Sequence, residues 1–207
     1  MEKLGKVLLG DNCAVDEGVQ LGYLSPRKGF ENVLKIGDGA TIRSGSVIYA
    51  GTTIGDNLQT GHNIVIREQN EIGNNFCIWN NTVVDYGVKI GHNVKIHCGI
   101  YIAQFTVIED DVFMAPGVMI ANDMHPGCPD SAECMRGPTI KQGVQIGVNV
   151  TLVPFITIGE RSLIGSGSVV TKDVPPESVV YGNPARVQGS IKDLSCRTQI
   201  RDIGPYV

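Results

Sequence analysis

Aliphatic side chains recur at every sixth residue over two long stretches of this chain. Between Ile36 and Ile120, fourteen of the fifteen positions at this spacing hold Ile, Val or Met, and Thr60 is the exception. Between Ile140 and Val170 all six such positions are aliphatic. An α-helix repeats its buried face about every 3.6 residues and an ordinary strand about every second residue, so neither buries this stripe. The period therefore restricts the chain to a solenoid of six-residue units.

A second period of 18 residues lies on the first. Ile-Gly pairs begin at positions 36, 54, 72 and 90, and again at 146 and 164. We therefore expect three hexapeptides to form one coil with three short strands, and coils to stack through parallel pairing about 4.8 Å apart. One aliphatic side chain per strand fills the narrow prism, while Gly and Asn serve its corners. We expect three flat faces with mixed polar exteriors.

Composition excludes several other classes of protein. The 207 residues carry a net charge of −4, only 18% are charged and 26 are glycine, which is unlike a coiled coil. The chain has no cluster of Lys and Arg that suits nucleic acid, and no apolar run of about 18–20 residues, the length of a membrane span. Six scattered cysteines and the lack of an apolar signal-peptide core favour reduced thiols and a cytoplasmic location.

The repeat and the segment from Ile164 to Val187 resemble the hexapeptide-repeat acetyltransferases, most closely the nucleotide-aminosugar N-acetyltransferases. This resemblance implies an all-β fold, a left-handed parallel β-helix over residues 1–189, with residues 190–207 as a C-terminal tail. It also implies acetyl-CoA as co-substrate and a homotrimer with active sites between subunits. The residues that it places beside coenzyme A are Gly165, Lys172 and Arg186.

The repeat is interrupted once. Phase is kept to Ile120 and regained at Ile140, so 14 residues are extra and we expect a long loop over 121–138. Loops inserted in solenoids usually lie on the binding face. In the family such a loop carries a catalytic His just before a Pro, which the resemblance places at His125. A neutral imidazole suits the acceptance of a proton from an attacking amine. The alternative is a His that only caps a turn. The substrate-binding residues that the resemblance adds in this loop are Asn122 and Asp123.

Another group of polar residues lies in register along one edge of the predicted prism. His62, Asn80 and Cys98 are 18 residues apart, so they stack on successive coils about 5 Å apart. The segments around His62 and Asn80 resemble sugar-binding elements of the aminosugar acetyltransferases, which implies that both bind substrate. Where the relatives carry a further Asn pair, this chain has Cys98-Gly99. A solvated corner His and a left-handed Asn are the alternative.

Two zinc hypotheses compete with acyl transfer. His125, Cys128 and Cys134 lie in one loop and are suitable ligands for a structural zinc, which would remove His125 as a base. The second hypothesis is the γ-class of carbonic anhydrases, which is built on the same β-helix and uses two His five residues apart. His92 and His97 have that spacing, but His62 stacks in phase with neither.

The sequence therefore predicts an acetyl-CoA-dependent acyltransferase, and no metal is assigned to it. We expect it to N-acetylate an amino group of a nucleotide-linked sugar for surface polysaccharide synthesis. O-acetylation of a sugar and a non-enzymatic β-helix scaffold compete with this hypothesis.

Overall fold

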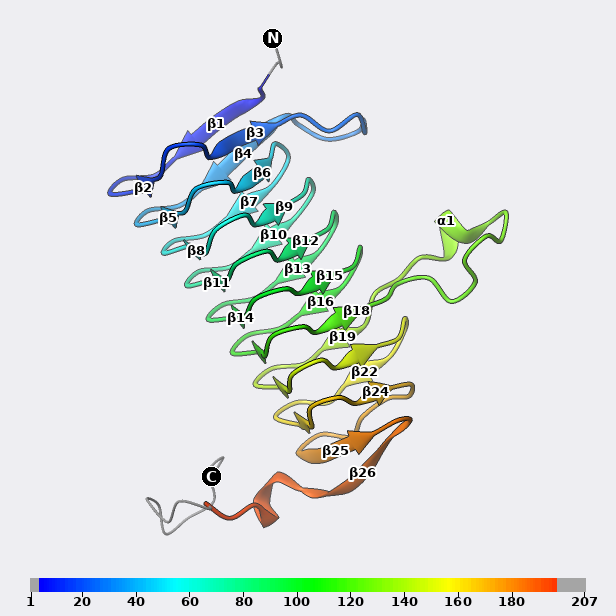
Figure 1. Cartoon of the computed structure of the whole chain (residues 1–207). Helices are drawn as coiled ribbons and strands as arrows, with labels where there is room; N and C mark the ends of the chain where they lie inside the picture. Colours follow the sequence, from blue (N-terminus) through cyan, green and yellow to red (C-terminus); the bar gives the residue numbers. More distant parts are fainter. Residues whose placement is uncertain (1–3, 197–207) are drawn as a thin grey trace.

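The computed structural model describes residues 4–196, which form a three-sided prism of stacked coils (Figure 1). Each full coil contributes one short strand to each of three sheets, and neighbouring strands in a sheet come from consecutive coils. All pairs between coils are parallel. The left-handed parallel β-helix expected from the period and the resemblance is confirmed.

We name the sheets A, B and C in the order in which a coil visits them. The strands of sheet A are β1 (Lys6–Leu9), β4 (Val33–Ile36), β7 (Thr53–Ile54), β10 (Glu71–Ile72), β13 (Lys89–Ile90), β16 (Val107–Ile108), β19 (Thr139–Ile140) and β22 (Thr157–Ile158). Those of sheet B are β2 (Ala14–Val15), β5 (Thr41–Ile42), β8 (Gln59–Thr60), β11 (Cys77–Ile78), β14 (Lys95–Ile96), β17 (Phe113–Met114), β20 (Gln145–Ile146), β23 (Leu163–Ile164), β25 (Ser178–Gly182) and β26 (Ala185–Ser190). Those of sheet C are β3 (Gln20–Tyr23), β6 (Val47–Tyr49), β9 (Val65–Ile66), β12 (Val83–Val84), β15 (Tyr101–Ile102), β18 (Met119–Ile120), β21 (Thr151–Leu152) and β24 (Val169–Val170).

The strand register follows the 18-residue period. Ile36 pairs with Ile54, one coil later. Ile108 pairs with Ile140, 32 positions later, so the loop 121–138 adds 14 residues without shifting the stack. The loop length predicted from the broken phase is therefore confirmed.

The six-residue stripe fills the prism, and each of its members is at most 6% exposed. Each corner adds a second inward position that the stripe did not reveal. Leu58, Ile64 and Phe76 fill it with apolar side chains, whereas Thr82 and Asn70 fill it with polar ones. These polar side chains bond to the backbone, and the Thr82 hydroxyl donates to the carbonyl of His97 at 2.8 Å. Burial of a hydroxyl is tolerated because the bond satisfies it.

Asparagines at the corners between sheets A and B form a ladder of side-chain hydrogen bonds. Asn57 donates from Nδ2 to Asn75 Oδ1 at 3.0 Å, and Asn75 donates onward to Asn93 at 2.9 Å. Asn93 donates to Asp111 Oδ1 at 3.0 Å and ends the ladder. All four residues have positive φ, between 57° and 61°. The corners thus need residues that tolerate the left-handed region and carry an amide or carboxylate.

Substitution of Asn75 tests this ladder. Asn75→Ala should lower the free energy of unfolding by about 1–2 kcal/mol. The change removes two hydrogen bonds, and alanine keeps the Cβ that disfavours a φ of 59° but lacks the polar side chain that lets Asn adopt it. Asn75→Gly loses the same bonds without the steric cost, so its loss should be smaller. Denaturant melts of both variants measure this, and equal losses would show that φ carries no part of it.

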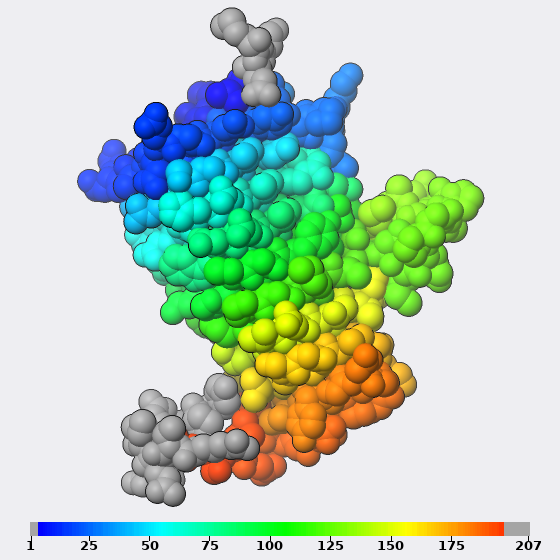
Figure 2. Space-filling model, in the orientation of Figure 1, coloured from blue at the N-terminus to red at the C-terminus, as the bar shows by residue number. Residues whose placement is uncertain are grey.

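Two segments leave the prism where sheet C turns into sheet A. Residues 24–32 connect β3 to β4, and the loop 121–138, which contains the single-turn helix α1 (Ser131–Cys134), connects β18 to β19 (Figure 1). Figure 2 shows the loop 121–138 as a lobe that stands off the prism. Both excursions lie on one side of the molecule, which marks that side as the place for a site.

The C-terminal end of the prism carries elements that lie outside the six-residue repeat. β25 and β26 form an antiparallel hairpin on sheet B, and the 3₁₀-helix η1 (Ile191–Asp193) follows it. The predicted tail 190–207 thus begins as ordered structure, and its residues 197–207 lie outside the described residues. Within residues 4–196, no helix is long and apolar enough to cross a bilayer.

Candidate functional site

The corners that join sheet C to sheet A form one long edge of the prism, which we name the C–A edge. It consists of residues 49–52, 67–70, 85–88, 103–106 and the loop 121–138. The corners that join sheet B to sheet C form the B–C edge, with residues 43–46, 61–64, 79–82 and 97–100.

His125 is exposed near the start of the long loop. Its backbone N–H donates to Asp123 Oδ1 at 2.8 Å, and its carbonyl accepts from Cys128 N–H at 3.0 Å. The turn is therefore held by the backbone of His125, while the imidazole makes no hydrogen bond to any residue in the described part of the chain. The turn-capping alternative does not account for the side chain, which is open to a ligand.

Asp123 organises this turn. Its Oδ2 accepts from the Ser131 hydroxyl at 2.5 Å, while Oδ1 accepts from the His125 N–H. The hydrogen bond from Ser131, then that from His125 N–H, lowers the pKa of Asp123. Both carboxylate oxygens are engaged with the loop, so Asp123 positions His125, and its direct contact with substrate stays a prediction.

A group of charged side chains lies under the C–A edge. Arg67 donates to Glu68 Oε1 at 3.0 Å and to Asp85 Oδ1 at 2.9 Å. The Glu68 side chain is 0% exposed and that of Asp85 is 8% exposed. Glu68 also accepts from the Ser25 hydroxyl at 2.8 Å and lies 3.5 Å from Arg27 Nε. Two buried carboxylates are thus balanced by two arginines, one of them from the 24–32 excursion.

Asp85 joins this group to the long loop. Its Oδ2 accepts from the Tyr101 hydroxyl at 2.7 Å and from Gln104 Nε2 at 2.6 Å. Gln104 Oε1 in turn accepts from Asn122 Nδ2 at 2.6 Å. Burial, followed by the hydrogen bond to Asp85, raises the pKa of Tyr101 to about 12, so its hydroxyl stays a donor at neutral pH. Asn122, predicted to bind substrate, is therefore tied to the buried charges.

Sequence reasoning missed these supporting residues, although a signal was present. Arg67 and Asp85 are 18 residues apart, which places opposite charges at the same corner of consecutive coils. Tyr86, Gln104 and Asn122 follow the same spacing. Opposite charges 18 residues apart at the corners are thus a sequence signal for ion pairs between consecutive coils, such as Arg67 with Asp85.

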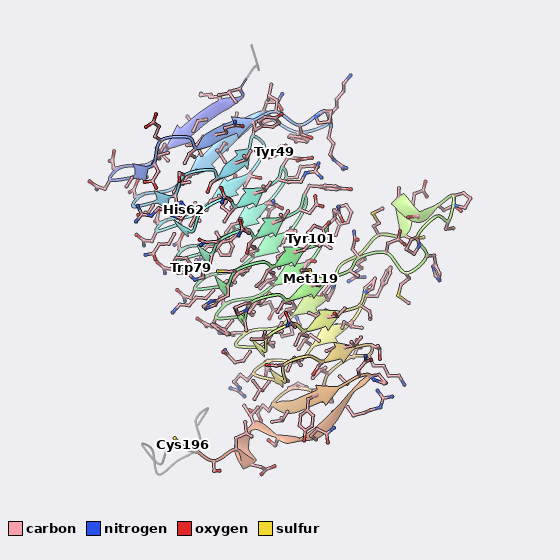
Figure 3. The ribbon with its side chains drawn as sticks, viewed as in Figure 1. Tyr49, His62, Trp79, Tyr101, Met119 and Cys196 are labelled. Carbon is pink, nitrogen blue, oxygen red and sulfur yellow. The ribbon has the colours of Figure 1, made fainter. Side chains whose placement is uncertain are left out.

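His62 and Asn80 lie on the other edge of sheet C. As predicted, they stack on successive coils, and the His62 N–H donates to Asn80 Oδ1 at 2.9 Å. His62 Nδ1 lies 3.0 Å from Ser44 Oγ. In Figure 3, His62 and Trp79 lie on the side away from the loop, whereas Tyr101 and Met119 lie toward it. One chain therefore does not bring His62 and Asn80 together with His125, and their role in substrate binding stays a prediction.

The zinc hypotheses gain no support from the geometry. Within residues 4–196, no group of three or more His, Cys, Asp or Glu is placed to hold a metal ion. Cys128 and Cys134 are exposed free thiols. His92 accepts from Asn74 N–H at the A–B corner, whereas His97 packs against Phe113, so the two His are on different edges.

Lys172 and Arg186 line one pocket at the last coil. The pocket has a volume of about 190 Å³, and Asp173 and the apolar residues Val170, Val180 and Val187 line it as well. Both cations are exposed. The structure thus brings together the two residues predicted to hold phosphate.

Gly165 is the third residue predicted to lie beside coenzyme A, and in the structure it lies against Tyr181. A Cβ on Gly165 would lie 2.8 Å from the Cβ of Tyr181. Tyr181 belongs to β25, so the glycine allows β25 to pack against β23 in sheet B. A contact between Gly165 and coenzyme A stays a prediction.

The three faces of the prism differ more than expected. The outward residues of sheet A are polar along most of its length and include Lys35, Thr53, Glu71 and Lys89. Those of sheet C are mainly apolar, namely Val47, Val65, Val83, Tyr101 and Met119. Met119 is 46% exposed, next to the long loop. The expectation of three faces with mixed polar exteriors is therefore wrong, because sheet C carries an apolar face between the two edges.

Comparisons with known proteins agree with this fold. Residues 137–172 match the family model "Bacterial transferase hexapeptide (six repeats)", and residues 33–67 match "Hexapeptide repeat of succinyl-transferase". A crystal structure of a UDP-N-acetylglucosamine acyltransferase from Bacteroides fragilis is similar in fold. Its TM-score is 0.74 at 20% identity, covering 89% of this chain and 71% of that one.

Two curated relatives differ in the bond they form. A galactoside O-acetyltransferase from Lactococcus lactis is 35% identical over 141 residues, which cover 62% of this chain and 66% of the relative. A dTDP-3-amino-3,6-dideoxy-alpha-D-galactopyranose 3-N-acetyltransferase from Aneurinibacillus thermoaerophilus is 41% identical over 64 residues, which cover 31% of this chain and 32% of the relative. The chain therefore spans less than two thirds of the length of either relative.

Proposed function

Because the chain belongs to the hexapeptide-repeat transferase family, we propose that it transfers an acetyl group from coenzyme A to a nucleotide-linked aminosugar at the C–A edge. One observation carries the proposal. The imidazole of His125 is exposed and unbonded within the described residues, on a loop whose turn Asp123 holds and which Asn122 fastens to the prism. A base that is held in place yet free to meet the acceptor favours acyl transfer.

In the proposed reaction, acetyl-CoA supplies an activated thioester. The amino nitrogen of the sugar attacks the carbonyl carbon, a C–N bond forms, and the C–S bond breaks to release the thiolate of coenzyme A. His125 takes the proton that the nitrogen loses and passes it to the thiolate sulfur, which typically contributes about 10²–10⁴-fold in rate. Asp123 keeps the turn in place, since its carboxylate accepts from the His125 N–H at 2.8 Å. Asn122 contacts the acceptor sugar.

O-acetylation is the second candidate, and the Lactococcus relative favours it because that alignment is the longer of the two. Matched pairs of nucleotide-linked sugars, with an amino group or a hydroxyl at the same carbon, separate the candidates. The proposal expects a higher kcat/KM for the amine in at least one pair. Higher values for the hydroxyl in every active pair would reassign the enzyme to O-acetylation.

The pocket at Lys172 and Arg186 supports a place for the phosphates of coenzyme A. Replacing either cation by Ala should raise the KM for acetyl-CoA about tenfold, because a charge-assisted hydrogen bond is worth about 1.5–3 kcal/mol and exposed cations such as these fall at the lower end. The change in kcat should be smaller, since the bond is present in ground and transition states alike. Lys89→Ala, on the polar face of sheet A, is the control. An unchanged KM in both variants would place coenzyme A elsewhere.

The apolar exterior of sheet C supports a homotrimer with sites between subunits. Val65, Val83 and Met119 would then be covered by a neighbouring subunit, and His62 of one edge could meet a loop from another chain. Light scattering should give a particle with three times the chain mass of 22.2 kDa. A stable monomer at micromolar concentration would contradict this assembly.

A further inference from the structure

The side-chain amides of Gln104 and Asn122 form a short relay from Asp85 to the loop. Gln104 donates from Nε2 to Asp85 Oδ2 at 2.6 Å, and its Oε1 accepts from Asn122 Nδ2 at 2.6 Å. Asn122 is half-buried, and its carbonyl accepts from Arg136 N–H at 2.8 Å, which closes the base of the loop. The relay therefore ends at the base of the loop 121–138, which carries His125.

The chemistry of Asp85 fixes the direction of every bond in this relay. A carboxylate only accepts hydrogen bonds, so the Gln104 amide must turn its NH₂ group toward Asp85. The Gln104 amide oxygen then faces Asn122, which must donate a hydrogen bond to it from Nδ2. The orientation of both amides follows from this argument, although nitrogen and oxygen look alike in shape.

Asp85 is itself held on all sides. Oδ1 accepts from Arg67 Nη1 at 2.9 Å and from the Tyr86 N–H at 2.8 Å. Oδ2 accepts from Tyr101 and Gln104. One coil beyond Asp85, the equivalent corner position is Ala103, which carries no polar side chain, and the next residue, Gln104, supplies the amide that bonds to Asp85. These four donors hold the Asp85 carboxylate in place, and its position sets which way the two amides turn.

One atom at the end of the relay has no partner. Asn122 Oδ1 receives no hydrogen bond from any residue between 4 and 196, whereas its Nδ2 is committed to Gln104. A half-buried amide oxygen accepts readily from a ligand N–H or O–H. Reversal of the amide would instead present a donor to the ligand.

Building on the proposed function, we propose that Asp85 and Gln104 are positioning residues, which turn the Asn122 amide so that Oδ1 accepts a hydrogen bond from the amino or hydroxyl group of the acceptor sugar. The geometry points to a ligand group that carries a hydrogen next to the reacting atom. It disfavours an acceptor that offers only oxygen lone pairs there. Asp85 and Gln104 touch neither substrate nor His125 in this account and act only through Asn122.

The test uses two variants of Gln104 and one control in the full chain. Gln104→Met keeps the length of the side chain and removes both bonds, so Asn122 is free to reverse. Gln104→Glu supplies an acceptor-only group while ionised, but once protonated it donates to Asp85 and accepts from Asn122, as the glutamine does. The control is Gln59→Glu, an exposed glutamine on sheet B.

We expect Gln104→Met to raise the KM for the acceptor sugar about threefold to tenfold, the worth of one hydrogen bond, with little change in the KM for acetyl-CoA. Gln104→Glu should show the same defect at neutral pH and recover as the pH falls. Its introduced carboxyl faces Asp85 and Tyr101, with Arg67 behind Asp85. Asp85 favours the protonated form, so protonation restores the relay. The ratio of variant to wild-type KM at each pH removes every pH dependence that the two proteins share.

The outcomes separate this inference from the proposed function. If the wild type acetylates no acceptor, the proposed function fails and the inference fails with it. If the wild type is active but Gln104→Met keeps its KM, or Gln104→Glu shows no recovery in acid, the inference alone is overturned. An NMR measurement checks the relay without turnover. The Asn122 and Gln104 side-chain NH₂ protons should be protected from exchange in the wild type, and those of Asn122 should lose protection in Gln104→Met. Unprotected NH₂ protons in the wild type would also overturn the inference.

Discussion

Replacing His125 by Asn is expected to lower kcat by 10²-fold or more, because a general base typically contributes about 10²–10⁴-fold. The backbone bonds that shape the turn use the N–H and carbonyl of His125, so the variant should keep the loop fold. The KM for acetyl-CoA should change little. The wild-type pH–rate profile should fall in acid, since a protonated imidazole has no free lone pair, and the variant should lack that limb.

His92→Asn is the matched control for this prediction. His92 Nδ1 accepts from Asn74 N–H at 3.0 Å, one rung of a column in which Asp56, Asn74 and Asp110 accept through oxygen. Asn should therefore replace His92 with near-normal kcat. If His125→Asn also keeps near-normal kcat, no essential base is present, and direct attack by a positioned amine would explain the reaction.

The zinc alternative predicts a different pattern from the same loop. If His125 were a zinc ligand, Cys128→Ala and Cys134→Ala would be as harmful as His125→Asn, and the purified protein would contain zinc. We expect near-normal kcat in both cysteine variants and no effect of chelators.

Loss of Arg67 should be the most destabilising change at the C–A edge. Arg67→Met leaves Glu68, whose side chain is 0% exposed, with Ser25 and a 3.5 Å contact to Arg27, and it removes one partner of Asp85. Breaking a buried ion pair from one side costs about 3–5 kcal/mol. Denaturant unfolding of the assembled protein at one fixed concentration measures the loss.

Arg43→Met is the control for Arg67→Met. Arg43 also pairs with a carboxylate, Asp16, at 3.4 Å, but the Arg43 side chain is 48% exposed and that of Asp16 is 33% exposed. Such pairs contribute about 0–1 kcal/mol, so this variant should unfold almost as the wild type does. Equal losses in the two variants would show that burial of Glu68 and Asp85 adds nothing to the cost.

The two periods of the sequence were sufficient for the coil and its register, whereas the left hand of the helix came from the family resemblance. Six residues fix the strand spacing and 18 fix the register, which is why Ile108 could be expected to pair with Ile140 across the loop. The antiparallel hairpin of β25 and β26 could not be expected, because it lies where the repeat ends. The apolar face of sheet C was also missed, since the aliphatic stripe drew attention to the inward positions alone.

The candidate site was predicted less completely, and the register explains why. His62 and Asn122 are 60 residues apart, which is three coils and one hexapeptide, so they lie on different edges of the prism. Motif resemblance assigned both to substrate without this constraint. The 18-residue spacing of Arg67 and Asp85 was a signal in the sequence, but their bonds to each other and to Gln104 could be assigned only once the side-chain directions at the corners were known.

The proposed acyl transfer takes place at the C–A edge, which carries His125. The most direct measurement is thiol release from acetyl-CoA, with mass spectrometry of the acceptor, across a panel of nucleotide-linked 2-, 3- and 4-aminosugars. The account predicts acceptor-dependent release of one thiol per acetylated sugar by the wild type, and at least 10²-fold slower release by His125→Asn. It would be contradicted if the folded wild type released no thiol with any acceptor, or if both proteins released it equally fast.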